Sequence, residues 1–89
     1  MAIAVKLPTV LRPFAGGAER VEADGATVGE VVAALEPVLR RRLTDEQGAV
    51  RRHVNIYLGD DNIRDLDGLG TAVQDGDELV VLPSVAGGA

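Results

Sequence analysis

The chain has 89 residues, a formal net charge of −5 and no cysteine. This length allows one domain and excludes a multidomain enzyme. Without cysteine there is no disulfide framework, zinc knuckle or cysteine nucleophile, and one histidine excludes a multi-histidine metal site. The acidic balance disfavours nucleic acid as a partner. With 46% hydrophobic residues and no apolar run of membrane-spanning length, we expect a folded, soluble, cytoplasmic protein.

The first segment predicts a strand and a hairpin. Residues 3–7 alternate between apolar and other side chains, which is typical of a half-buried strand, and Pro8 ends it. Residues 13–17 combine proline and glycine and therefore favour a turn. Residues 19–23 give a second, weakly apolar strand, so we expect a hairpin with a long connection.

A helix is predicted after Thr27. The sequence from Thr27 to Glu30 fits a capping box, in which the threonine hydroxyl accepts from the Glu30 amide and the glutamate reaches back. One apolar stripe at helical spacing follows, formed by Val28, Val31, Val32 and Leu35. Pro37 predicts that this helix ends near Leu35 or Glu36.

Pro37 also suits the first position of a second, short helix that ends at residues 40–43. Residues 44–52 are polar and predict a loop. Residues 54–58 alternate as a third strand, closed by residues 59–62.

The last third of the chain predicts one more strand. Residues 63–74 favour an irregular connection with about one helical turn. The turn at residues 75–77 leads into residues 78–82, which are apolar on both faces, as expected of a central strand covered on each side. Pro83 ends this strand.

The order strand–strand–helix–short helix–strand–strand predicts an α+β fold of two layers. If the first and last strands lie side by side in the centre, the fold is a β-grasp, the ubiquitin-like fold, with a mixed sheet packed on one main helix. We expect a domain over residues 1–83 and a tail over residues 84–89.

Candidate catalytic and metal-binding groups are weak. His53 is interpreted as an ordinary residue at the start of a strand, and Ser84 lacks the context of a nucleophile elbow. The acidic residues of the 60–67 region do not fit a calcium loop, because both anchoring carboxylates are missing; they are Asp60, Asp61, Asp65 and Asp67. Residues 68–70 fail as a phosphate-binding loop, so we expect no metal and no bound cofactor.

Five arginines allow two interpretations. They form either a docking patch for an acidic partner or a solvated helix end that satisfies carbonyl groups. The second interpretation is favoured. The residues are Arg40, Arg41, Arg42, Arg51 and Arg52.

The tail carries the most unusual feature, the pair Gly87 and Gly88. Glycine buries nothing and adds conformational freedom, so it does not stabilise a fold there. A frayed end is one interpretation. The other is a thin stalk, reaching roughly 20 Å from Pro83 to Gly88, that carries a reacting carboxylate into another protein's active site.

Several segments together resemble the ubiquitin-like sulfur carriers of the MoaD/ThiS family. The resemblance covers nearly the whole chain and is most similar to the actinobacterial-type carrier that feeds a cysteine synthase. Other members serve molybdopterin and thiamine biosynthesis. The segments that carry it are Pro-Thr-Val-Leu-Arg-Pro at 8–13, Val-Asn-Ile-Tyr-Leu at 54–58, Asp-Gly-Asp-Glu at 75–78 and Leu-Pro-Ser-Val-Ala-Gly-Gly at 82–88.

This resemblance implies a carrier and not an enzyme. A partner activating enzyme of the E1 type uses ATP to adenylate the Gly88 carboxylate, and a sulfur donor displaces AMP to leave a thiocarboxylate. A sulfur-accepting synthase then consumes it. The tail residues that enter the partner's active site are Val85, Ala86, Gly87 and Gly88. The alternative is a ubiquitin-like protein modifier or docking module.

The resemblance also implies a docking surface and a processing step. Partners dock transiently on a monomer, through an apolar patch near the last strand, at Pro8, Arg12, Leu58 and Leu82. Mature carriers end at the second glycine, whereas Ala89 follows it here. Either a metal-dependent peptidase removes Ala89, or Ala89 is an addition to the natural sequence.

Overall fold

The first two strands form the predicted hairpin. In the computed structural model, which describes residues 2–83, β1 (Ala2–Lys6) pairs antiparallel with β2 (Arg20–Asp24). Both strands lie within one residue of their predicted positions. Ile3 and Val5 are buried while their neighbours on β1 are not, as the alternation requires.

The connection between β1 and β2 contains a 3-10 helix, η1 (Thr9–Ala15), where the sequence predicted only a turn at 13–17. This short helix has no helical apolar periodicity to reveal it. Local turn interactions form it. The Leu11 amide donates to the Pro8 carbonyl at 3.0 Å, and Gly16 ends the helix with φ +66°. Leu11 and Phe14 thereby pack against the core.

The main helix α1 (Val28–Ala33) begins at Thr27 as predicted, but it is shorter than expected. The Glu30 amide donates to Thr27 Oγ1 at 3.2 Å, while Glu30 Oε1 accepts from the Ala26 amide instead of that of Thr27. After Ala33 the chain makes a tighter turn, in which the Leu35 amide donates to the Val32 carbonyl three residues earlier. Leu35, the last residue of the apolar stripe, is therefore still buried.

The second helix α2 (Pro37–Leu43) matches its prediction, with Pro37 at the first position and an extended residue before it. It turns Leu39 and Leu43 into the core. No helix within residues 2–83 is long and apolar enough to cross a membrane.

Three further strands complete the sheet. β3 (Val54–Leu58) and β5 (Glu78–Pro83) lie where they were predicted, apart from one extra residue in β5. The residues expected to be only a closing loop include a two-residue strand, β4 (Asp61–Asn62), which pairs with β3. Its pairing is set by the turn at 59–60 and not by any apolar pattern. Residues 63–74 contain two 3-10 turns, η2 (Ile63–Asp65) and η3 (Gly68–Gly70).

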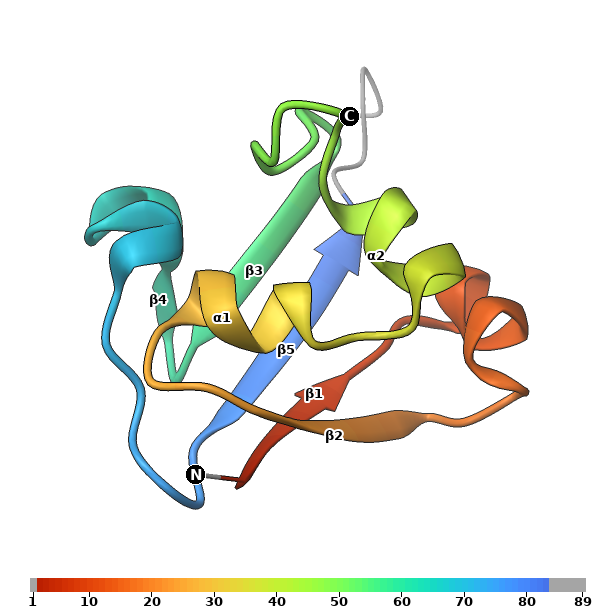
Figure 1. Cartoon of the computed structure of the whole chain (residues 1–89), viewed down its shortest axis with the longest axis horizontal. Helices are drawn as coiled ribbons and strands as arrows, with labels where there is room; N and C mark the ends of the chain where they lie inside the picture. The colour runs from red at the N-terminus through yellow and green to blue at the C-terminus, as the bar shows by residue number, and fades with distance from the viewer. Residues whose placement is uncertain (1, 84–89) are drawn as a thin grey trace.

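The five strands form one mixed sheet in the order β2-β1-β5-β3-β4. The first and last strands are central neighbours and run parallel, while the other pairs are antiparallel. Both α-helices lie on the same face of this sheet (Figure 1). The predicted α+β, β-grasp architecture is therefore confirmed.

The opposite face of β5 is not covered by any element within residues 2–83, so the prediction of a strand covered on each side is wrong there. Leu79 and Val81 point into the core and are at most 2% exposed. Val80 is only half-buried, and Leu82 is 44% exposed. Both faces of the strand are apolar, but only one is needed for the core that lies under the helices.

Candidate functional site at the end of the last strand

The end of β5 is where the described chain meets the tail. Pro83 lies opposite Val54 in the antiparallel register of β3 and β5, so the chain leaves the sheet beside the start of β3 and near the end of α2 (Figure 1). The predicted tail residues lie outside the described residues, and their roles stay predictions; they are Ser84, Val85, Ala86, Gly87, Gly88 and Ala89.

A small apolar hollow opens at this end of the sheet. Its volume is about 200 Å³, and we call it the C-terminal hollow. Its walls come from η1, α2, β5 and the start of β3. The lining residues are Val10, Leu11, Phe14, Arg42, His53, Val54, Val81, Leu82 and Pro83. Buried Val54 and Val81 form its base, because they belong to the core face of the two strands.

The rim of the hollow contains apolar side chains that face solvent. Val10 is 63% exposed and Leu82 is 44% exposed. Across the rim, the guanidinium of Arg42 lies 4.2 Å from the centre of the Phe14 ring, a cation–π contact that holds both side chains in place. Covering exposed apolar area gains roughly 25 cal/mol per Å², so this rim favours an apolar group of a partner.

The four predicted docking residues do not come together. Leu82 lines the C-terminal hollow. Leu58 pairs with buried Leu79 and packs against the core, so it lies on the opposite face of the sheet from Leu82. Leu58 does not line the C-terminal hollow, so the structure does not bring the two leucines together there.

Pro8 and Arg12 lie close to the hollow in sequence but do not line it. Pro8 is the residue before η1, and Arg12 Nε donates to the Leu7 carbonyl at 3.3 Å. These two residues position η1 and hence the hollow's wall.

The sequence reasoning missed three hollow residues, Val10, Leu11 and Phe14, and assigned no role to His53. The available signal was the pair Val10 and Leu11, which are apolar but lie outside any predicted strand or helix. His53 is exposed and precedes β3, as interpreted from the sequence.

The acidic residues at 60–67 gain no support as a cation site. Within residues 2–83, no group of three or more histidine, cysteine, aspartate or glutamate side chains could hold a metal ion. Residues 68–70 form η3, and the buried hydroxyl of Thr71 beside it accepts from the Asp67 amide at 3.1 Å.

A protein-family model matches almost the whole chain. The model described as the ThiS family matches residues 5–88, which end at Gly88. This chain belongs to the ThiS family. The predicted resemblance is thus confirmed.

Curated relatives fall into two groups. The chain is 44% identical over 93 aligned positions to the sulfur carrier protein CysO of Mycobacterium tuberculosis, covering 99% of this chain and 100% of the relative. It is also 46% identical over 68 positions to the small archaeal modifier protein 3 of Haloferax volcanii, covering 73% of each. ThiS-family relatives of this chain therefore include both sulfur carriers and modifier proteins.

Solved structures agree with the sequence relatives. A chain of the Amycolatopsis orientalis BexX/CysO complex superposes with a TM-score of 0.87 at 40% identity, covering 96% of this chain and 98% of that one. The structure of M. tuberculosis CysO gives a TM-score of 0.82 at 39% identity, with 93% and 99% covered. At least one structural relative is thus found in complex with another protein.

Proposed function

We propose that this ThiS-family chain is a sulfur carrier whose reacting group is the carboxylate of Gly88. The observation that carries the proposal is the match to CysO over almost the full length of both chains. The family match that ends at Gly88, and the position of Gly87 and Gly88 four and five residues after the last strand, support it.

Two steps load the carrier. A partner activating enzyme of the E1 type transfers AMP from ATP to the Gly88 carboxylate, which releases pyrophosphate. A sulfide donor then attacks the carbonyl carbon, so that a C–S bond forms and the C–O bond to AMP breaks. The resulting thiocarboxylate is a tethered sulfur anion that reaches only an enzyme on which the carrier docks. ATP is thus a substrate of the partner, and this chain needs no bound cofactor.

Processing precedes loading. Because Ala89 follows Gly88, the Gly88 carboxyl group is held in a peptide bond. We propose that a peptidase removes Ala89. A peptide carbonyl is not a free carboxylate and cannot be adenylated, so the unprocessed chain is expected to be inert.

Intact-mass measurement tests this order of events. The full chain and a form that lacks Ala89 are each incubated with an activating enzyme, ATP and sulfide. We expect only the shortened form to exchange one oxygen for sulfur. Equal exchange in both forms would show that no processing is needed.

A modifier function is the second candidate, favoured by the 46% identity to the small archaeal modifier protein 3. In that case the Gly88 carboxyl group forms isopeptide bonds to lysine side chains. Because Arg64 is the last lysine or arginine before Gly88, tryptic peptides from cells that express the tagged chain would carry residues 65–88 as a remnant on lysine. The absence of such remnants, together with detectable thiocarboxylate, supports the carrier.

A further inference from the structure

Arginines concentrate where α2 ends and β3 begins. Residues 40–42 and 51–52 supply five of the nine lysines and arginines, in a chain of net charge −5. Such crowding of like charges opposes folding unless something offsets it. The contacts of each arginine show which of them the fold itself uses.

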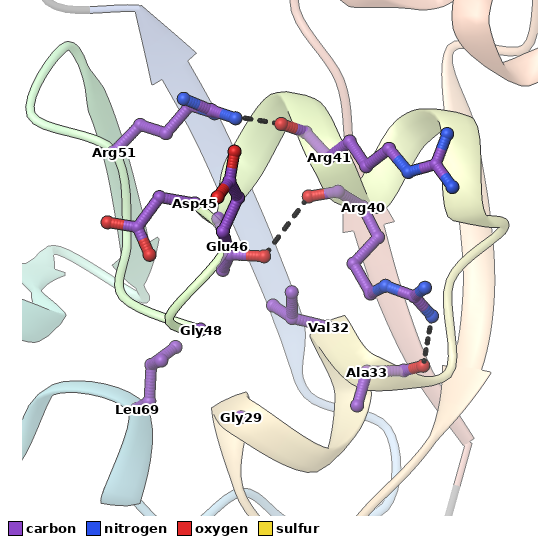
Figure 2. Close-up of a pocket in the computed structure, with 11 residues that line it drawn as sticks. Gly29, Val32, Ala33, Arg40, Arg41, Asp45, Glu46, Gly48, Arg51 and Leu69 are labelled. Atoms are coloured by element: carbon purple, nitrogen blue, oxygen red, sulfur yellow. Dashed lines mark hydrogen bonds between the residues drawn. The ribbon is translucent and has the colours of Figure 1, made fainter.

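Arg40 and Arg51 donate hydrogen bonds to backbone carbonyls at the ends of helices, as the favoured interpretation required. Arg40 Nη1 donates to the carbonyl of Ala33, the last residue of α1, at 3.3 Å. Arg51 Nε donates to the Arg41 carbonyl in the last turn of α2 at 2.8 Å. Figure 2 shows both contacts: the first links α2 to α1, and the second links the loop before β3 to α2.

Arg41, Arg42 and Arg52 are exposed and serve no such purpose. Within residues 2–83, none of the three guanidinium groups has a carboxylate partner or a hydrogen bond, and that of Arg42 lies over the Phe14 ring. The nearest acidic residues along the chain, Asp45 and Glu46, line a neighbouring hollow together with Arg40, Arg41 and Arg51 (Figure 2). The Asp45 carboxylate there accepts from two backbone amides of its own loop.

Two of these arginines, Arg41 and Arg42, line a concave surface. A hollow of about 410 Å³ is walled by Val38, Arg41, Arg42, Arg51 and His53, and we call it the arginine hollow. Its loop wall is fixed, because the Arg51 carbonyl also accepts from Arg64 Nη2 at 2.9 Å. A loop backbone that is already held in place lowers the entropic cost of docking a partner segment against it.

The arginine hollow adjoins the site already described. Arg42 and His53 line both it and the C-terminal hollow, at the end of the sheet where the tail begins. We propose that the arginine hollow docks an acidic segment, rich in aspartate and glutamate, of the protein that receives the tail. The identification of that protein as the recipient rests on the proposed function. Since the chain as a whole is acidic, an acidic partner is attracted to this face and repelled by others, which aligns the tail with its target.

A peptide titration tests the proposal without any sulfur chemistry. The ¹⁵N-labelled full chain is titrated with hexaglutamate peptide with blocked ends, and in a separate experiment with ATP. We expect saturable amide shifts at residues 41–42 and 51–53 with the peptide. The apparent affinity should weaken as added salt shortens the Debye length from about 30 Å to about 8 Å.

Two matched double variants sharpen the test. Arg41→Gln with Arg42→Gln removes two charges that line the arginine hollow and make no hydrogen bond in the fold, and we expect about three- to tenfold weaker peptide binding. Ala72→Glu with Gln74→Glu lowers the net charge equally at exposed positions before the other end of β5, and should bind nearly as the parent does.

Three results would overturn the proposal: no saturable peptide shifts, equal weakening by both double variants, or tighter binding of ATP than of the peptide at the same amides. The last result would make the hollow a phosphate site. Because no outcome depends on Gly88 being activated, failure here is distinct from failure of the carrier function.

Discussion

Gly25 stands between β2 and α1, where the chain passes very close to the helix. A methyl group on Gly25 would lie 2.7 Å from the backbone nitrogen of Val31, which cannot move without distorting α1. We expect Gly25→Ala to lower the free energy of unfolding by about 1–3 kcal/mol. Gly70→Ala, at a position with open space around it, is the control. Urea denaturation of both variants measures the difference, and equal stability would contradict this view of the α1 entry.

Thr27 is the N-cap whose hydroxyl accepts from the Glu30 amide. Thr27→Ala leaves that amide without its partner, so we expect a loss of about 1 kcal/mol in the free energy of unfolding. Thr27→Ser retains the hydroxyl and should lose much less. Thermal unfolding of both variants compares them; a serine variant as unstable as the alanine variant would show that the hydroxyl is not the cause.

The cap illustrates what single residues reveal from sequence. The pattern from Thr27 to Glu30 predicted the start of α1 and the hydroxyl bond correctly, because both depend on spacing alone. The partner of the Glu30 carboxylate was not predictable. It depends on the backbone path at Gly25 and Ala26, which brings the Ala26 amide within 2.9 Å of the carboxylate.

Among the helices and strands, α2 contributes to both the hydrophobic core and the arginine hollow. Leu43 is fully buried at its end, whereas Val38 is 53% exposed on its other side. We expect Leu43→Ala to cost about 2–5 kcal/mol and Val38→Ala to change stability by less than about 0.5 kcal/mol. Chemical denaturation tests this. A similar cost for the two substitutions would mean that α2 is not anchored through its buried leucines.

Helices and central strands were predictable because apolar periodicity and proline positions mark them. The elements that escaped prediction, η1 and β4, are held by turns and by pairing with a neighbour, and neither has a periodic apolar face. Turn-forming residues alone do not predict η1 or β4, because both elements depend on contacts with the rest of the fold. η1 matters for function, since it forms one wall of the C-terminal hollow.

Two leucines show where the site prediction reached its limit. Alternation in β3 places Leu58 on the same face as Val54 and Ile56, which the sequence already allowed one to see. In β5 every position from 79 to 82 is apolar, so the pattern does not tell which face is buried. Only the register with β3, which opposes Leu82 to Asn55, separates the two leucines.

At the scale of the whole molecule, the folded domain is proposed to act as a docking body for its own C-terminus. Leu82 then serves the partner and not the fold, since it is 44% exposed. We expect Leu82→Asp to lower kcat/KM for adenylation by the activating enzyme about tenfold or more, because an apolar contact is replaced by a charge.

Leu66 provides the matched control, because it is 42% exposed directly after η2 and does not line the C-terminal hollow. Leu66→Asp should retain kcat/KM, and both variants should unfold at similar urea concentrations. Equal losses of kcat/KM would show that the C-terminal hollow has no special role in docking.

The central claim is that the reacting atom belongs to Gly88. The most direct measurement is sulfur transfer to an acceptor enzyme from a chain that ends at Gly88, compared with one that ends at Ala86, after both are treated with the activating enzyme, ATP and labelled sulfide. If Gly88 carries the sulfur, a thiocarboxylate and labelled product form only from the chain that ends at Gly88. Labelled product formed equally from the chain that ends at Ala86 would contradict it.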